Sequence, residues 1–93
     1  MSVVAAVVLI QAERDHIPKA ARAIAELEGV AEVYSVAGDW DLIAILRVPE
    51  WEQIASVVTE QLARVPGIVR TNTLVSFRVF SRKDLESAFD MFE

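Results

Sequence analysis

The sequence predicts an α+β fold whose elements follow the order βαββαβ, and three observations support it. Four stretches are rich in the aliphatic and β-branched residues that favour strands. Two intervening stretches repeat apolar residues at spacings of three and four, which is typical of amphipathic helices. The two halves also echo each other, because Gly29 matches Gly67 and Ile10 matches Val48 at one common displacement.

The first strand and the first helix are predicted before Gly29. Val3 to Ile10 is an unbroken run of Val, Ala, Leu and Ile, as in a strand buried on both faces. Asp15 is placed to cap the following helix, which has Pro18 in its first turn. Gly29 ends that helix as the C′ residue. The apolar stripe of the helix consists of Ile17, Ala20, Ala21, Ile24 and Leu27.

A central hairpin is predicted from two further β-type runs. The first run is Val30 to Ala37, and the second begins at Asp41 or Leu42 and ends at Val48. A tight turn at Gly38-Asp39 joins them, because glycine adopts positive φ without steric cost. Pro49 stops the ladder after the second run, since it has no N–H to donate.

The second helix is predicted from the acidic residues Glu50 and Glu52, which complement the helix dipole, to about Arg64. Its apolar stripe consists of Trp51, Ile54, Ala55, Val58 and Leu62. After Pro66-Gly67 the chain alternates from Ile68 to Phe80, which predicts a long fourth strand. An apolar stripe after Ser81 predicts a short tail helix. We therefore expect one domain over 1–81 and a tail over 82–93.

This element order is the ferredoxin-like arrangement, a four-stranded antiparallel sheet with both helices on one face. Three of the strands carry apolar residues on both faces, so the face without helices needs a cover. Of the 93 residues in the chain, 54% are hydrophobic. We therefore expect the sheets of two subunits to pack against each other in a dimeric α/β sandwich.

The composition excludes several classes of function. Nine basic against 14 acidic residues give a formal charge of −5, which disfavours binding to nucleic acid. The chain has no cysteine and a single histidine, so we expect no metal site and no disulfide. The apolar run at Val3 to Ile10 is too short to span a bilayer, and a cytoplasmic location is the default expectation.

Several residues are candidates for chemistry, each with an ordinary alternative. Asp39 and Asp41 form an Asp-x-Asp pair that serves acid–base chemistry or binds a cation or an amine, or they are ordinary solvated residues of the turn and the strand edge. His16 is expected to be an exposed residue at a helix start. Trp40 and Trp51 are expected in a core or an interface more than in a pocket. The polar run Arg70, Thr71, Asn72 and Thr73 holds a small ligand or faces solvent.

Two segments, Val33–Leu42 and Val65–Thr73, resemble the effector domain of the leucine-responsive/asparagine-responsive (Lrp/AsnC) regulators. The family pattern has Val-Thr-Gly-x-x-Asp in the hairpin, and Pro-Gly-Val with Thr-rich residues before the last strand. The resemblance covers nearly the whole chain. Ala37 is a departure, because the family often has Thr there and one ligand hydroxyl is missing.

The resemblance implies a ferredoxin-like domain that dimerises through its sheet, assembles into a ring and holds an amino-acid effector between dimers. Gly38 and Asp41 fall on the ligand-loop Gly-x-x-Asp, and Thr71 to Thr73 on the second ligand segment. The family regulators carry a helix-turn-helix domain, which we expect to be absent because the first strand starts at Val3. The expected ligand-contacting residues are Tyr34, Gly38, Asp39, Trp40, Asp41, Thr71, Asn72 and Thr73.

The resulting hypothesis is a non-enzymatic, stand-alone effector domain without a cofactor. It is expected to form homo-oligomers, to bind an amino acid between subunits, and to modulate full-length Lrp/AsnC regulators without contacting DNA itself. One alternative is a small dimeric ferredoxin-like enzyme of the monooxygenase or isomerase type, which needs a polar group inside a cavity, such as one reached by His16. Another alternative is a purely structural assembly partner.

Overall fold

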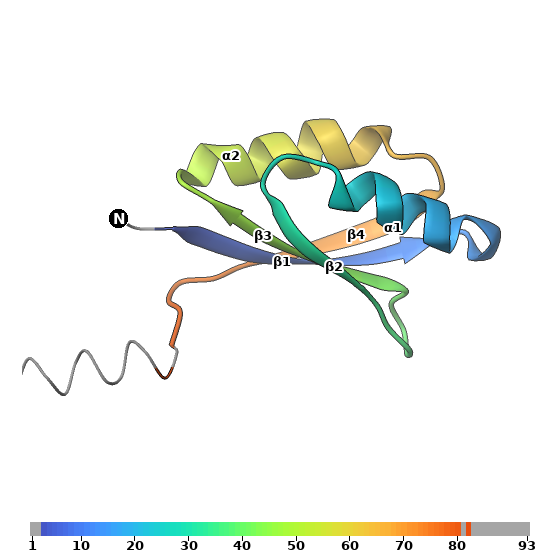
Figure 1. Ribbon diagram of the computed structural model, residues 1–93, viewed down its shortest axis with the longest axis horizontal. Coiled ribbons are helices and arrows are strands. Elements are labelled where there is room, and N and C mark those ends of the chain that lie inside the picture. The colour runs from blue at the N-terminus through green and yellow to red at the C-terminus, as the bar shows by residue number, and fades with distance from the viewer. Residues whose placement is uncertain (1–2, 81, 83–93) are drawn as a thin grey trace, which may run out of the picture.

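The computed structural model describes residues 3–80 and 82, which form two layers (Figure 1). One layer is an antiparallel four-stranded sheet in the order β2-β3-β1-β4. Both helices, α1 and α2, cover the same face of this sheet (Figure 1). The predicted βαββαβ order and ferredoxin-like layers are thereby confirmed. The strands are β1 (Val4–Ala12), β2 (Val30–Ser35), β3 (Leu42–Val48) and β4 (Ile68–Val75).

The core lies between the helices and the two central strands. Every second side chain of β3 is buried, and the antiparallel register places Val8 of β1 opposite both Ala44 and Thr73. The described residues bury no polar or charged side chain, so apolar burial dominates the stability of this layer. The buried apolar residues are Ala6, Val8, Ile10, Ala12, Ala20, Ile24, Leu42, Ala44, Leu46, Val48, Ile54, Val57 and Leu62.

The first helix, α1 (Ile17–Ala25), follows a 3-10 turn over Arg14–His16. The prediction that Asp15 caps it is wrong, because no side chain makes a capping hydrogen bond to the start of the helix. The Asp15 carboxylate instead lies 3.0 Å from the His16 Nδ1. The helix ends at Ala25, and residues 26–28 separate it from Gly29. The prediction that Gly29 is its C′ residue is therefore wrong.

The second helical segment is not one α-helix, which corrects the prediction. It consists of α2 (Trp51–Ala55), a π-helix over Ser56–Gln61 and a 3-10 turn over Leu62–Arg64. A π turn shifts the helix face relative to the α-helical pattern. Val57, which the predicted stripe omits, is therefore buried, whereas Trp51 is 60% exposed.

Three strands end at residues other than those predicted. β1 continues to Ala12, and β2 stops at Ser35 instead of Ala37. β4 ends at Val75 instead of Phe80, because it is an edge strand whose ladder with β1 runs only as far as the pair of Ala6 and Val75. The tail helix predicted over 82–93 lies, except for Arg82, outside the described residues.

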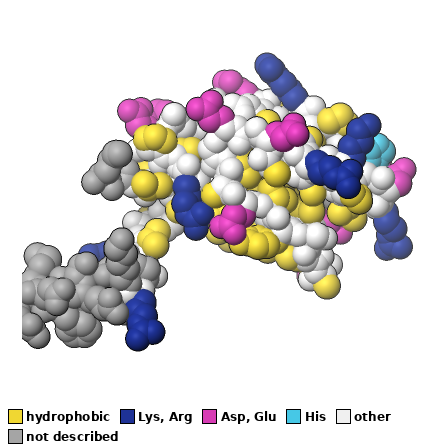
Figure 2. All heavy atoms as spheres, in the orientation of Figure 1, with side chains coloured by type: hydrophobic (Ala, Val, Ile, Leu, Met, Phe, Trp, Pro, Cys, Tyr) yellow, Lys and Arg dark blue, Asp and Glu magenta, His cyan; other side chains and the backbone are white. Residues whose placement is uncertain are grey.

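We call the face of the sheet away from both helices the open face. Its side chains alternate with those of the core, so Val7 lies opposite Ile45 and Leu74. Val7, Leu9, Ile43 and Ile45 are only half-buried, and Leu74 and Tyr34 are 52% and 47% exposed. Figure 2 shows hydrophobic side chains in yellow along the lower side of the sheet. The expectation of apolar residues on both faces is confirmed.

Candidate functional site

The loop that joins β2 to β3 is fixed to the end of β1. The Asp41 backbone N–H donates to the Ile10 carbonyl oxygen (2.9 Å), and the Asp41 Oδ2 accepts from the Ala12 N–H (2.9 Å). The Gln11 Nε2 also donates to the Asp39 carbonyl oxygen (2.8 Å). These bonds to β1 explain why the connection spans residues 36–41 and why the predicted two-residue turn is wrong.

Gly38 lies at the tip of this loop with φ of +121°. An added Cβ would meet nothing within 4 Å, so the glycine is required by its backbone conformation and not by lack of space. The neighbouring Asp39 is exposed, and its carboxylate makes no hydrogen bond or ion pair among residues 3–80 and 82. The loop therefore offers a free carboxylate to solvent.

Trp40 joins the loop to β4. The Arg70 guanidinium lies over the Trp40 ring at 4.6 Å from its centroid, a cation–π contact. Arg70 also pairs with Gln11 in the β1–β4 register, so these side chains meet at one end of the open face. The sequence analysis did not single out Gln11. The sequence could have indicated Gln11, because it is the single polar residue in β1.

The polar run after Gly67 is divided between the two faces of the sheet. Thr73 lines an apolar hollow of about 220 Å³ against α2, and Thr71 lines a neighbouring hollow of about 160 Å³. Asn72 pairs with Leu9 on the open face. Within one chain, the two threonines therefore lie on the other side of the sheet from Asn72 and Arg70.

Tyr34 forms a polar border of the open face with Glu32 and Arg47. The Tyr34 hydroxyl donates to the Glu32 carboxylate, and the Arg47 Nη1 lies 3.4 Å from the Glu32 Oε1. The hydrogen bond from Tyr34, followed by that from Arg47, lowers the pKa of Glu32 below its ordinary 4.5. The same bond raises the pKa of Tyr34 above its ordinary 10.0. This border is held together by charge and hydrogen bonding.

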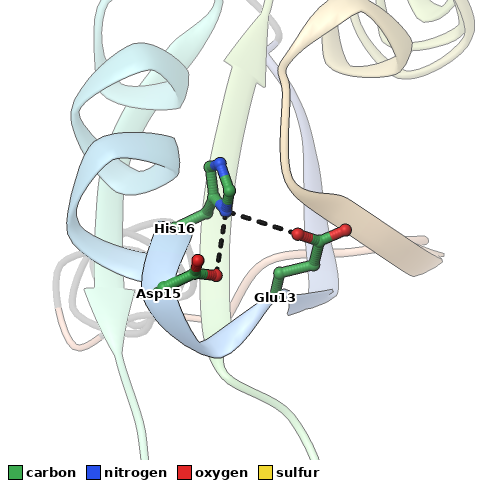
Figure 3. Close-up of side chains that lie close together, drawn as sticks. All are labelled: Glu13, Asp15 and His16. Carbon is green, nitrogen blue, oxygen red and sulfur yellow. Dashed lines mark hydrogen bonds and ion pairs between the residues drawn. The ribbon is translucent and has the colours of Figure 1, made fainter.

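His16 lies with Glu13 and Asp15 at the start of α1 (Figure 3). Its Nδ1 is 3.0 Å from the Asp15 Oδ1 and 3.4 Å from the Glu13 Oε2. These contacts account for the cluster, and we assign it no ligand. His16 was expected to be exposed but is half-buried, because its ring packs on Gly67, where an added Cβ would lie 2.5 Å from the His16 Cβ.

Three hollows stand out on the described part of the chain, and His16 lines none of these three. They therefore do not supply the cavity reached by His16 on which the enzymatic alternative depends. A search of the described helices also found no segment with the length and hydropathy needed to cross a membrane.

This chain is similar in sequence and in fold to known proteins. A family model described as the Lrp/AsnC ligand binding domain matches residues 5–85. An uncharacterized HTH-type transcriptional regulator of Pyrococcus furiosus is 40% identical over 57 residues, which are 61% of this chain and 38% of the regulator. The leucine-responsive regulatory protein of Escherichia coli K12 is 36% identical over 53 residues, 57% of this chain and 32% of that protein.

The matched stretch thus covers well under half the length of these two relatives. A solved structure from Thermus thermophilus superposes with a TM-score of 0.80 and 42% sequence identity. That superposition covers 85% of this chain and 99% of the Thermus chain. The likeness therefore extends over most of this chain.

Proposed function

The chain belongs to the Lrp/AsnC ligand-binding domain family, and from this premise we propose that it is an oligomerising regulatory domain that binds a free amino acid. The amino acid is bound where the β2–β3 loops of two subunits meet. One relative, the leucine-responsive regulatory protein, is named for its response to an amino acid. In this proposal, binding between subunits couples the ligand to assembly.

The open face supports the oligomer. Four strands spaced by about 4.8 Å, each roughly eight residues long at about 3.3 Å per residue, span an area on the order of 500 Å². The half-buried or exposed side chains of Val7, Leu9, Ile43, Ile45 and Leu74 form an apolar patch within this area, and such a patch is typical of an interface. Two such sheets pack face to face about a twofold axis, so Val7, Leu9 and Ile45 of one subunit lie against the same residues of its partner.

Asp41 carries the ligand proposal. Its Oδ2 is fixed by the Ala12 N–H, and its other carboxylate oxygen has no partner among the described residues. A carboxylate held in this way is suited to accept a hydrogen bond from an ammonium group. The Arg70 guanidinium on Trp40 supplies the opposite charge for a carboxylate at the same end of the sheet. The two charges together match a zwitterion.

The remaining predicted contacts require a second subunit. Thr71 and Thr73 face away from Asn72 within one chain, so their hydroxyls reach the ligand only from a neighbouring subunit. The same surfaces allow mixed assembly with full-length Lrp/AsnC regulators, which is the route by which we propose the domain modulates transcription.

Calorimetric titration with each proteinogenic amino acid at millimolar concentration tests the proposal. We expect saturable heat with at least one amino acid, and Asp41→Asn to weaken that binding about tenfold through loss of a charge-assisted hydrogen bond. Glu60→Gln is the matched control, because Glu60 is an exposed acidic residue of the π-helix and lies away from the β2–β3 loop. Absence of heat with every amino acid, together with an unchanged oligomer size, would remove the effector role and favour the structural alternative.

A further inference from the structure

We propose a second small-molecule site in a polar hollow at the other end of the β2–β3 hairpin, for a small primary amine. The hollow has a volume of about 330 Å³, at the lower end of the range for small-molecule sites. It lies between the turn before β2, the end of β3 and the helical segment that starts with α2. The polar side chains around it are those of Glu28, Gln53, Ser56 and Gln61, whereas the Arg47 side chain pairs with Glu32 on the open face.

The π-helix brings Ser56 and Gln61 to this hollow. Residues five apart lie about 140° apart around an α-helix with about 3.6 residues per turn, so they face different directions. In a π-helix the hydrogen bonds join residues five apart, which places those residues nearly above one another. The π-helix covers Ser56–Gln61, and both of its terminal residues line the hollow. Such turns occur frequently at functional sites.

Three polar side chains of the lining have no partner among the residues that the structure describes. The Glu28 carboxylate, the Ser56 hydroxyl and the Gln61 carboxamide make no side-chain hydrogen bond or ion pair within residues 3–80 and 82. The fourth is engaged, because the Gln53 Oε1 accepts from the Glu50 N–H (3.1 Å). The Arg47 guanidinium lies 3.4 Å from Glu32 on the open face, opposite to the side chains of Leu46 and Val48.

The wall of the hollow is closely packed. Gly29 has φ of +95°, and an added Cβ there would lie 2.9 Å from the Val48 Cγ1 and 3.3 Å from the Val57 Cγ2. The Gly29 carbonyl oxygen accepts from the Arg47 N–H (2.9 Å). These contacts hold the turn that carries Glu28 against β3 and the π-helix. The hollow is therefore already formed within one subunit.

The free groups define the class of ligand. Glu28 is the uncommitted charge, so it selects a cation that donates hydrogen bonds, which is an ammonium group. The hydroxyl of Ser56 and the carboxamide of Gln61 then donate to, or accept from, a further polar group on the same molecule. Free amino acids and amino alcohols of similar size both have this chemistry. The site is distinct from the proposed effector site, because it lies at the opposite end of the hairpin and needs no second subunit.

Amide chemical shifts of the ¹⁵N-labelled, assembled protein test the proposal with three kinds of probe. The probes are proteinogenic amino acids taken singly, ethanolamine, and the corresponding acids that lack the amino group. We expect saturable shifts at Gly29, Ser56 and Gln61 with at least one amine and none with its desamino analogue. If only amino acids act, the ligand is a zwitterion; if ethanolamine also acts, the ammonium group suffices.

The outcome separates this site from the effector site. Shifts in the hollow without shifts at Gly38 and Asp41 support the second site and contradict the proposed function. Shifts confined to the β2–β3 loop support the proposed function and overturn the second site. Absence of shifts near Ser56 with every amine likewise overturns it.

Variants identify the groups responsible. Ser56→Ala and Gln61→Ala should each weaken binding about fivefold, and Glu28→Gln about tenfold, as expected for neutral and charged hydrogen bonds. Thr59→Ala is the matched control, because its hydroxyl donates to the Ala55 carbonyl oxygen (2.6 Å) and lines the neighbouring hollow. Equal weakening by Thr59→Ala would indicate a general effect on the helix and overturn the roles of Ser56 and Gln61. Glu28→Gln is independent of helix stability, since Glu28 lies in a turn.

Discussion

The two faces of the sheet are made from the same strands but differ in what covers them. On β3, Leu46 has no solvent exposure beneath the helices, whereas the adjacent Ile45 on the open face is only half-buried. Alternation along a strand places neighbours on opposite faces. The covered face therefore holds one chain together, and the open face has apolar area left for a second chain. Substitutions of Leu46 and of the adjacent Ile45 therefore form a matched pair that tests this difference.

Leu46→Ala should produce the largest loss of stability. Removing a fully buried leucine side chain leaves a cavity in the core and costs about 2–5 kcal/mol of unfolding free energy. Urea denaturation measures this loss. Ile45→Ala is the control, and at subunit concentrations low enough to separate the chains it should cost clearly less. Equal losses under those conditions would contradict the distinction between the faces.

Asp41→Asn should have an intermediate effect, because it weakens the attachment of the loop to the end of β1. The Ala12 N–H is partly buried and loses a charged acceptor, which costs about 1–3 kcal/mol. Thermal unfolding compared with Asp39→Asn measures the difference. A loss as small as that of Asp39→Asn would show that the Asp41 carboxylate does not hold the loop.

The smallest effect is expected at the border of the open face. The pKa of Glu32 is lowered on folding, so its contribution to stability is present above its ordinary 4.5 and is lost as pH falls through the lowered value. The pKa of Tyr34 is raised, so its contribution is present below 10.0 and is lost as pH rises through the raised value. In Tyr34→Phe the stability profile should flatten at both ends. An unchanged profile would contradict the Tyr34 to Glu32 bond.

Much of the fold was predictable from the sequence because its signals are local. The apolar runs of β1 and β3 and the helical spacing of Ile54 and Leu62 each act over a few residues. The π-helix was not predictable, since the spacing of Trp51, Ile54, Ala55, Val58 and Leu62 also fits an α-helix. The end of β4 depends on where β1 stops pairing, which no pattern within β4 indicates.

The candidate site was less predictable because its contacts are long-range. The bond from the Ala12 N–H to Asp41 and the contact of Arg70 with Trp40 join residues far apart in sequence. The family resemblance indicated the loop residues Gly38 and Asp41, and their ligand role remains a prediction. The free polar groups around Ser56 depend on an irregular helix, so neither composition nor motif indicated them.

The mass of the protein in solution tests the central claim, that the open face is an interface, most directly. Light scattering at micromolar concentration should give at least twice the 10.3 kDa of one chain. Ile45→Lys, which places a charge on the open face, should reduce the mass to a single folded chain, with circular dichroism as the control for folding. A monomeric wild-type protein at this concentration, or an Ile45→Lys variant that remains assembled, would contradict the claim.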